Sequence, residues 1–338
     1  MKTTVGLLMA CLVALSALYA FSARHTPPLA ATRIAVDRMH FNSVARAGNT
    51  LVAGGELGHI LWSADEGKSW QEASVEPKRY ALVTRIVFID DKHGMAVGHE
   101  GQILRSADGG KSWKELRFDE SNGEPLMSIA KLPSGDWLAV GAFGRALRSS
   151  DDGKTWNKVQ LAGAEDKHMN RIVAGSDGKR WLIVGERGLV LSSSDGGQNW
   201  ALVPPFYNGS LYGAVQLADG SWVAYGMRGN AFHAGADLQR WTKAEVPAPV
   251  SLLGHALAAD GSLLVVGQGG MVLRSSDGGA KFTVARAGGR ASITDIALLA
   301  DGSWALSSDA GMLRHDPKQA ARPAPANTAA PAASGAKS

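Results

Sequence analysis

The chain has 338 residues, which is enough for one large all-β domain or for two ordinary domains. Its formal net charge of +4 fits an anionic partner, but no long run of like charges appears, which excludes the usual signature of a nucleic-acid-binding protein. The only cysteine, Cys11, excludes a disulfide framework and a cysteine-based metal site.

The first predicted element is an apolar N-terminal segment. Lys2 precedes the apolar run VGLLMACLVALSALYAF, an order that is typical of a secretory signal. The small residues Ala20 and Ser22 stand at the −3 and −1 positions of a cleavage site after Ser22. Residues 1–22 are therefore interpreted as a signal peptide.

Two other interpretations of this segment stay open. Residues 5–21 approach the minimum of about 17 apolar residues for a membrane span, which would make the segment a retained anchor in contact with the membrane. Cys11 would carry a lipid if the preceding residues were a lipobox, although the apolar run ahead of it is short. All three interpretations predict an exported protein that is periplasmic, secreted or anchored to the inner membrane.

A self-similar unit follows, with a period of 41 to 44 residues. Each copy contains a short apolar run that ends in glycine. The aligned glycines are Gly55 (or Gly54), Gly98, Gly141, Gly185, Gly226 and Gly267. A seventh copy, WALSSDAGMLRH (304–315), keeps the apolar run and has serine in place of the glycine.

Each full unit predicts four short strands. A strand such as MSIAKL (127–132) leads through a turn into the run that ends in glycine. A third strand, such as QILRSA (102–107), leads into a turn phrase, and a fourth strand begins at the tryptophan of that phrase. Four short strands in roughly 40–45 residues are typical of a propeller blade. The sequence therefore predicts an all-β fold, a seven-bladed β-propeller of four-stranded blades.

The last copy ends after three strands, near His315. The segment TRIAV (32–36) is an unassigned apolar strand ahead of the first copy. We expect it to supply the missing strand of blade seven and to close the ring, so that no sheet edge is left open. The propeller then covers residues 32–316, and the Ala/Pro-rich segment 317–338 is predicted to be a disordered tail.

A recurring nine-residue phrase, the Asp-box, joins the third and fourth strands. It occurs as WSADEGKSW (62–70), RSADGGKSW (105–113), RSSDDGKTW (148–156), SSSDGGQNW (192–200) and RSSDGGAKF (274–282). The aspartate can accept hydrogen bonds from backbone N–H groups two residues on, and the glycine two positions later can take a positive φ. We interpret as structural the residues Asp65, Asp108, Asp151, Asp195, Asp277, Trp70, Trp113, Trp156 and Trp200.

No catalytic, metal or cofactor site is predicted from motifs. Five equivalent Asp-boxes spread round a ring cannot converge on one substrate, and they have too few carboxylates for calcium loops. The histidines are scattered without ligand spacing, and no phosphate-binding loop or nucleophile elbow occurs. We therefore expect no cofactor and no enzyme activity.

Two groups of arginines are candidate binding residues. Arg85 and Arg171 lie on predicted innermost strands, where they can bind a carboxylate, a phosphate or an acidic peptide, or else hold neighbouring loops. Arg145, Arg187 and Arg228 follow the aligned glycine in GAFGR, GERG and GMRG. Repeated turns project on one face, so these three form either a shared basic patch or ordinary solvated turns.

The unit VGxxGxxLRSxDGGxSW makes the chain resemble the photosystem II assembly/stability factor family of seven-bladed propellers, over about residues 32–316. That group includes bacterial relatives with no link to photosynthesis. The resemblance implies a non-catalytic scaffold that binds membrane-protein subunits during assembly through an arginine-rich face. We expect a monomer that binds an envelope or membrane protein, with an acidic segment of that partner as the counterpart. Arg85, Arg171, Arg145, Arg187 and Arg228 match that face in kind.

The alternative is a sialidase-like glycoside hydrolase or a glycan-binding propeller, because Asp-boxes also occur in those proteins. Sialidase chemistry needs three arginines on a carboxylate, a Tyr–Glu nucleophile pair and an acid/base aspartate. Tyr212 is a tyrosine that could reach a channel mouth. The convergence of a tyrosine, a glutamate and three arginines in one pocket would favour this alternative.

Overall fold

The computed structural model describes residues 2–22, 35, 38–121 and 123–318. The chain divides into two units, Met1–Ile34 and Ala35–Ser338. The first contains helix α1 (Lys2–Ala20), and no helix among the described residues is long and apolar enough to cross a membrane. The predicted closing strand, of which only Ala35 is described, and residues 319–338 of the predicted tail lie outside the described residues.

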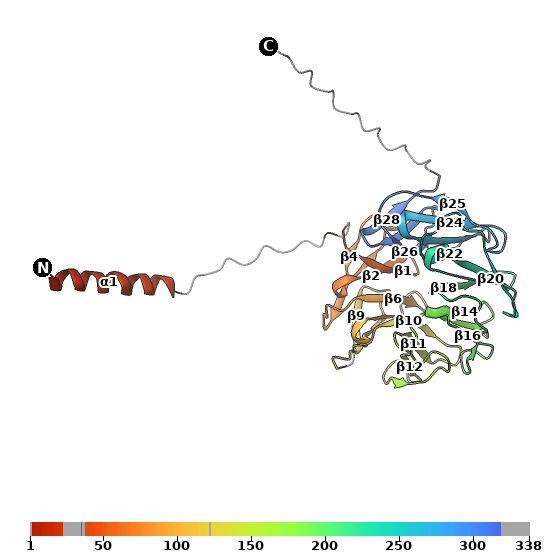
Figure 1. Cartoon of the computed structure of the whole chain (residues 1–338), viewed down its shortest axis with the longest axis horizontal. Coiled ribbons are helices and arrows are strands. Elements are labelled where there is room, and N and C mark those ends of the chain that lie inside the picture. The colour runs from red at the N-terminus through yellow and green to blue at the C-terminus, as the bar shows by residue number, and fades with distance from the viewer. Residues whose placement is uncertain (1, 23–34, 36–37, 122, 319–338) are drawn as a thin grey trace, which may run out of the picture. The chain divides into compact units, whose positions relative to one another are not determined.

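The second unit confirms the seven-bladed β-propeller. Among the described residues, seven antiparallel sheets succeed one another along the chain and surround a common axis (Figure 1). The innermost strands are β1 (Phe41–Ala47), β6 (Val83–Phe88), β10 (Leu126–Lys131), β14 (Met169–Ala174), β18 (Leu211–Gln216), β22 (Leu252–Leu257) and β26 (Ile293–Leu298). The second strands are β2 (Thr50–Gly55), β7 (Gly94–Gly98), β11 (Trp137–Gly141), β15 (Trp181–Gly185), β19 (Trp222–Gly226), β23 (Leu263–Gly267) and β27 (Trp304–Ser308).

The outer half of each blade is shorter. The third strands are β3 (Ile60–Ser63), β8 (Ile103–Ser106), β12 (Ala146–Ser149), β16 (Val190–Ser193), β20 (Ala231–Ala234), β24 (Met271–Ser275) and β28 (Gly311–His315). The fourth strands are β4 (Gln71–Glu72), β9 (Ser112–Arg117), β13 (Asn157–Lys158), β17 (Ala201–Leu202), β21 (Trp241–Lys243) and β25 (Thr283–Arg286). Blade 7 has three described strands, and β5 (Ser74–Glu76), after the last strand of blade 1, pairs in parallel with β9 of blade 2.

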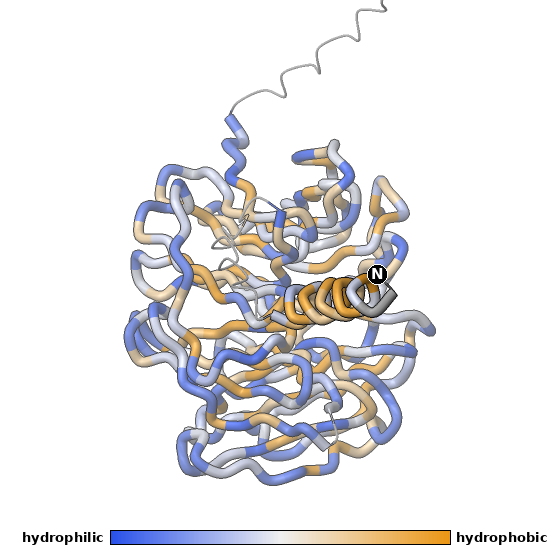
Figure 2. The backbone as a smooth tube through the Cα atoms, turned by 90° about the vertical axis from the view of Figure 1, so that its left-hand side faces the viewer, coloured by the Kyte–Doolittle hydropathy of each residue, from blue (hydrophilic) through white to orange (hydrophobic). Residues whose placement is uncertain are grey.

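The core lies between neighbouring blades. Every residue of the second strands is buried except Thr50, because these strands are covered on both faces, so they are continuous apolar runs instead of alternating ones. In one cluster Leu138 and Val140 of blade 3 pack with Ile183 and Leu191 of blade 4. Figure 2 shows the hydrophobic residues concentrated on the strands and the hydrophilic ones on the connecting turns.

The Asp-box turns have one geometry. Asp108 accepts hydrogen bonds from the amides of Lys111 and Ser112, three and four residues on, instead of two residues on as the sequence suggested. Ser106 Oγ donates to Asp108 and accepts from the amide of Gly110, whose φ is 86°. Trp113 is 2% exposed, whereas Trp70, Trp156 and Trp200 are only half-buried. The hydrogen bonds of the Asp108 and Ser106 side chains are therefore made within the turn, and none is directed to an external ligand.

Candidate binding face at the channel mouth

A β-bulge interrupts every innermost strand at the same place. In blade 1, Phe41 pairs with Gly55 and Ser43 with Gly54, so Asn42 is the extra residue. The seven extra residues are Asn42, Thr84, Met127, Asn170, Tyr212, Leu253 and Thr294. A bulge redirects a side chain out of the alternation of a strand, which is why bulges recur beside functional sites. Here the bulges point one residue from each blade toward the axis.

The aligned glycine of the repeat is explained by this bulge. Gly55 lies opposite Phe41, where the backbone bends so closely that an added Cβ would overlap the carbonyl oxygen of His40. Gly185 stands in the same relation to His168. The structure also identifies Gly55, and not Gly54, as the equivalent of the other aligned glycines.

The bulged residues surround a depression of about 480 Å³ at one end of the channel. Its wall also contains Arg85, Arg171, His40, His99 and Asp309. His99 and Asp309 belong to turns between second and third strands, and His40 belongs to the segment that leads into a first strand. In an antiparallel four-stranded blade both kinds of connection lie on one face, which we call the mouth face. The turns between first and second strands, and the Asp-boxes, lie on the opposite face.

Four of the bulged side chains hold adjacent blades together. Asn42 Nδ2 donates to the carbonyl of Val83 at 3.1 Å, and Thr294 Oγ1 donates to the carbonyl of Phe41 at 2.6 Å. The same relation holds between Thr84 and the carbonyl of Leu126, and between Asn170 and the carbonyl of Leu211. The bond from Thr294 joins blade 7 to blade 1, so part of the ring closure is made beside the channel.

The remaining three bulged residues form no such bond. Met127, Tyr212 and Leu253 are half-buried and line the depression from blades 3, 5 and 6. They give one side of the wall an apolar character, while the polar residues with inter-blade bonds lie on the other blades. A ligand that fits this wall must therefore bring apolar as well as polar groups.

Arg85 is neutralised within the protein. Its Nη1 lies 2.6 Å from Oδ2 of Asp295, and this carboxylate also accepts the amide of Val44 at 3.3 Å. Asp295 is 3% exposed, so the pair is shielded from water and joins blades 7, 1 and 2. This geometry favours the interpretation in which Arg85 holds neighbouring elements.

Arg171 is placed differently. Within the described part of the chain it forms no ion pair, and Nη2 donates to the carbonyl of Leu253 at 3.4 Å. Burial lowers the pKa of Arg171, and the neighbouring charge of Arg85 acts in the same direction. The charge of Asp295 and the hydroxyl of Tyr225 act in the opposite direction, so Arg171 is partly compensated at a distance but lacks a directly bound carboxylate, which a ligand can supply.

Below Arg171 the channel is neutral. The hydroxyl of Tyr225 lies 2.6 Å from Nδ1 of His255, and Tyr225 is fully buried. Burial lowers the pKa of His255 to about 3 and raises that of Tyr225, so both are uncharged at neutral pH. His255 is thus an interior histidine with a hydrogen-bond partner and adds no charge to the site.

The three turn arginines do not form one patch, which corrects the alignment of GAFGR with GERG and GMRG. Arg187 and Arg228 occupy the left-handed position of their turns, but the equivalent residue of blade 3 is Phe143, and Arg145 comes two residues later. Arg145 is 5% exposed and is bound to Asp119 and Glu124 at 2.9 and 3.0 Å. Its role is to hold the connection between blades 2 and 3.

The other two turn arginines are exposed on the mouth face. Arg187 is near Asp166 and Glu186 at 3.3 and 3.4 Å, with 58% of its side chain exposed. Arg228 is exposed and forms no ion pair with any described residue. The mouth face therefore carries Arg171 at its centre and Arg187 and Arg228 further out, over the adjacent blades 4 and 5.

The sequence placed Arg85 and Arg171 on innermost strands but did not reveal the bulged residues that line the depression with them. The signal was present in the repeated glycine, which marks the place where the partner strand must bulge. The depression brings together two arginines and one tyrosine, and its wall contains no glutamate. The described residues thus do not assemble the sialidase constellation there.

Comparison with known proteins places this geometry in context. A family model described as photosynthesis system II assembly factor YCF48 matches residues 30–106 and 80–243. The structure of YCF48 bound to a D1 peptide is similar with a TM-score of 0.66 and 18% identity, over 87% of this chain and 98% of that chain. YCF48 from Cyanidioschyzon merolae has a TM-score of 0.66 and 15% identity, over 85% and 98%.

Enzymes share the fold as well. A streptogramin B lyase structure has a TM-score of 0.70 at 13% identity, over 84% of this chain and 95% of that chain. Identities this low show a common fold and not a common chemistry. No curated protein matches the sequence.

Proposed function

Because the chain belongs to the family of the photosynthesis system II assembly factor YCF48, we propose that it captures a protein partner on the mouth face of its propeller. In this proposal it is a non-catalytic assembly or stability factor for a membrane-protein complex. The bound D1 peptide of a structurally similar YCF48 supports peptide capture by propellers of this kind.

The observation that carries the proposal is that Arg171 forms no ion pair with any described residue. Its side chain is half-buried in the wall of the depression, and without a directly bound carboxylate the guanidinium favours an anionic ligand there. Arg85 lies in the same wall on blade 2, two blades from Arg171, and already has Asp295 as its partner. The two arginines therefore differ in function, and Arg171 is the one that remains available for an anion.

The surroundings of Arg171 define the partner further. Met127, Tyr212 and Leu253 offer apolar contacts beside it, and Arg228 adds positive charge further out on the same face. A peptide with a carboxylate next to an apolar side chain satisfies both halves of the depression. Neutral or basic segments would leave Arg171 buried without a counter-charge.

We also propose that the propeller works outside the cytoplasm. The support is the sequence of residues 1–22, where a cationic residue precedes an apolar run and a small-residue cleavage site. Helix α1 (Lys2–Ala20) has no acidic residue in its first turn and no basic residue in its last turn, as expected for an apolar leader.

The test is a selection of random peptides displayed on phage against the full chain. We expect the enriched peptides to be rich in Asp and Glu, and the Arg171→Ala variant to lose this acidic enrichment. Lys154→Ala is the matched control, since it removes one exposed positive charge from an Asp-box on the opposite face. Enrichment without acidic residues, or unchanged acidic enrichment with Arg171→Ala, would contradict the proposal.

A further inference from the structure

Six turns on the mouth face share an unusual backbone conformation. Between the second and third strands, one residue adopts a left-handed conformation with φ between 51° and 68°. The six residues are Leu57, Glu100, Phe143, Arg187, Arg228 and Gly269. Only blade 6 uses glycine, the residue that adopts this conformation without strain.

The strain is specific to this position within the turn. The next residue is always glycine and also has a positive φ, as at Gly58, Gly188 and Gly229. There an added Cβ would overlap a backbone carbonyl of the following connection, so glycine is required. At the left-handed position, one residue earlier, the side chain is exposed to solvent, and no such overlap requires glycine there. Left-handed non-glycine residues also occur in turns of the opposite face, at Glu66, Asp152 and Leu238, so the exposed apolar side chains, and not the strain alone, single out Leu57 and Phe143.

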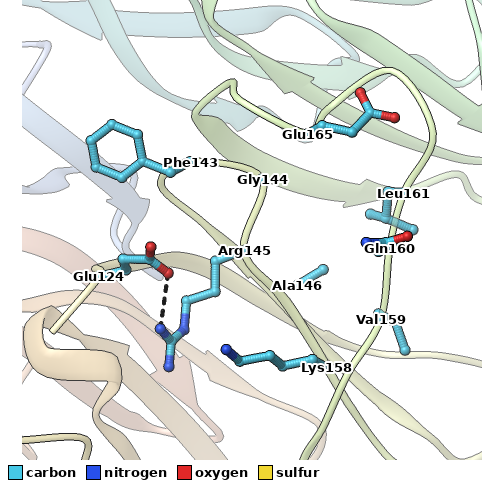
Figure 3. A pocket seen from close by; sticks show the side chains of 10 residues that line it. All are labelled: Glu124, Phe143, Gly144, Arg145, Ala146, Lys158, Val159, Gln160, Leu161 and Glu165. Atoms are coloured by element: carbon cyan, nitrogen blue, oxygen red, sulfur yellow. Dashed lines mark hydrogen bonds and ion pairs between the residues drawn. The ribbon is translucent and has the colours of Figure 1, made fainter. Parts of the chain in front are cut away.

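Two of these side chains are large, apolar and exposed. Leu57 is 52% exposed and Phe143 is 60% exposed, although both belong to residue types that rarely adopt a left-handed conformation. Figure 3 shows the ring of Phe143 pointing away from Leu161, while Arg145 extends toward Glu124. The ring has one edge contact with His168, with 4.7 Å between the ring centroids, and is otherwise open.

The chemistry of the six positions changes around the ring. Blades 1 and 3 present Leu57 and Phe143, and blades 4 and 5 present Arg187 and Arg228. Blade 4 also carries Arg171, but Arg187 is flanked by Asp166 and Glu186, so among the described residues of these turns Arg228 of blade 5 provides positive charge without an ion pair. The apolar half flanks blade 2, whose turn presents the carboxylate of Glu100.

We propose that the left-handed residues of these turns, above all Leu57 and Phe143, are contact residues for the captured protein. The occupant is a peptide segment in which large apolar residues accompany the acidic ones. The segment passes from the depression over the turns, its carboxylates on the side of Arg187 and Arg228 and its apolar side chains against Phe143 and Leu57. This inference rests on the proposed function and adds a second recognition element to it.

The test exploits the backbone conformation. In the double variant Leu57→Gly and Phe143→Gly, glycine relieves the left-handed strain, so we expect a melting temperature equal to or above that of the wild type. In the same phage selection, we expect the variant to keep the acidic enrichment and to lose the enrichment of Leu, Ile, Phe and Trp. A peptide selected on the wild type should bind the variant at least about tenfold more weakly, as expected for the loss of buried apolar contacts.

Ile89→Gly is the control, because Ile89 is 49% exposed in a turn on the opposite face. A clearly lower melting temperature of the double variant would overturn the inference, since the side chains would then serve folding. Unchanged apolar enrichment would overturn it as well. So would a wild-type dimer that the variant converts to a monomer, because the occupant would then be a second copy of the chain.

The two proposals fail in different ways. If the wild type enriches no acidic peptides, the proposed function is wrong and this inference falls with it. If acidic enrichment depends on Arg171 but apolar residues are not enriched, only the role of Leu57 and Phe143 is wrong.

Discussion

Arg85 of blade 2 and Asp295 of blade 7 form an ion pair in the channel wall, with 2.6 Å between Nη1 and Oδ2. The carboxylate also accepts the amide of Val44 in blade 1, the blade between them. Three blades are thereby tied at the point where the ring of the propeller closes. The pair is largely removed from water, since the side chain of Asp295 is 5% exposed and that of Arg85 is 22% exposed.

Breaking this pair from one side should be costly. We expect Asp295→Asn to lower the free energy of unfolding by about 2–4 kcal/mol, because it leaves the charge of Arg85 in the channel without a partner. Adding Arg85→Met should recover part of the loss, since the charge of Arg85 is then removed as well. Urea denaturation of both single variants and the double variant measures the coupling, and strictly additive effects would contradict the prediction.

Arg145 should behave as a structural residue and not as part of a binding patch. With 2% of its side chain exposed between Asp119 and Glu124, its replacement by Met leaves Glu124 without its counter-charge and Asp119 with Arg117 alone. We expect a loss of about 3 kcal/mol in unfolding free energy. Arg187→Ala, at an exposed position, should change it by less than about 0.5 kcal/mol. Equal effects of the two substitutions would show that the ion cluster has no special role.

Thr294 should contribute to ring closure through a single hydrogen bond. The variant Thr294→Val keeps the shape of the side chain and removes the donor to the carbonyl of Phe41, together with the hydrogen bond to Ser307 Oγ. We expect a loss of about 1 kcal/mol, measured by thermal or urea unfolding. Met127→Leu is the matched control, because Met127 occupies the same bulge in blade 3 and forms no inter-blade bond. A control as destabilised as Thr294→Val would argue that packing, not the bond, matters at this position.

The Asp-boxes should make the protein sensitive to acid. The hydrogen bonds of Ser69 to Asp65, of Thr155 to Asp151 and of Asn199 to Asp195 lower the pKa of each carboxyl to about 2, from an ordinary value of 3.8. A depressed pKa stabilises the fold above the ordinary value, and that contribution is lost as the pH falls from about 4 toward 2.

The corresponding measurement is the melting temperature as a function of pH. The wild type should lose stability steeply between about pH 4 and pH 2. The triple variant Asp65→Asn, Asp151→Asn, Asp195→Asn should start less stable and show a shallower fall, because three of the titrating groups are absent. An identical pH profile would mean that these carboxyls do not control the acid transition.

The sequence by itself determined the fold, because the information is local and repeated. Each Asp-box is closed by hydrogen bonds within nine residues, and the continuous apolar second strands show that both faces of each are covered. Copies of such a unit can only stack on one another, so the period and the number of copies were sufficient for the seven-bladed ring. Even the glycine before each turn had a local cause, the bulge opposite Gly55.

What each arginine does was decided only by the tertiary structure. Arg85 and Arg171 occupy equivalent positions of the repeat, yet Asp295, far away in the chain, neutralises only the first. In the sequence pattern Arg145 appeared equivalent to Arg187, but in the structure it is buried and paired with two carboxylates of the preceding connection, Asp119 and Glu124. The electrostatic state of a side chain depends on the distance to charges from other blades, and closing the ring sets those distances. The sequence pattern along the chain does not predict these distances between charges.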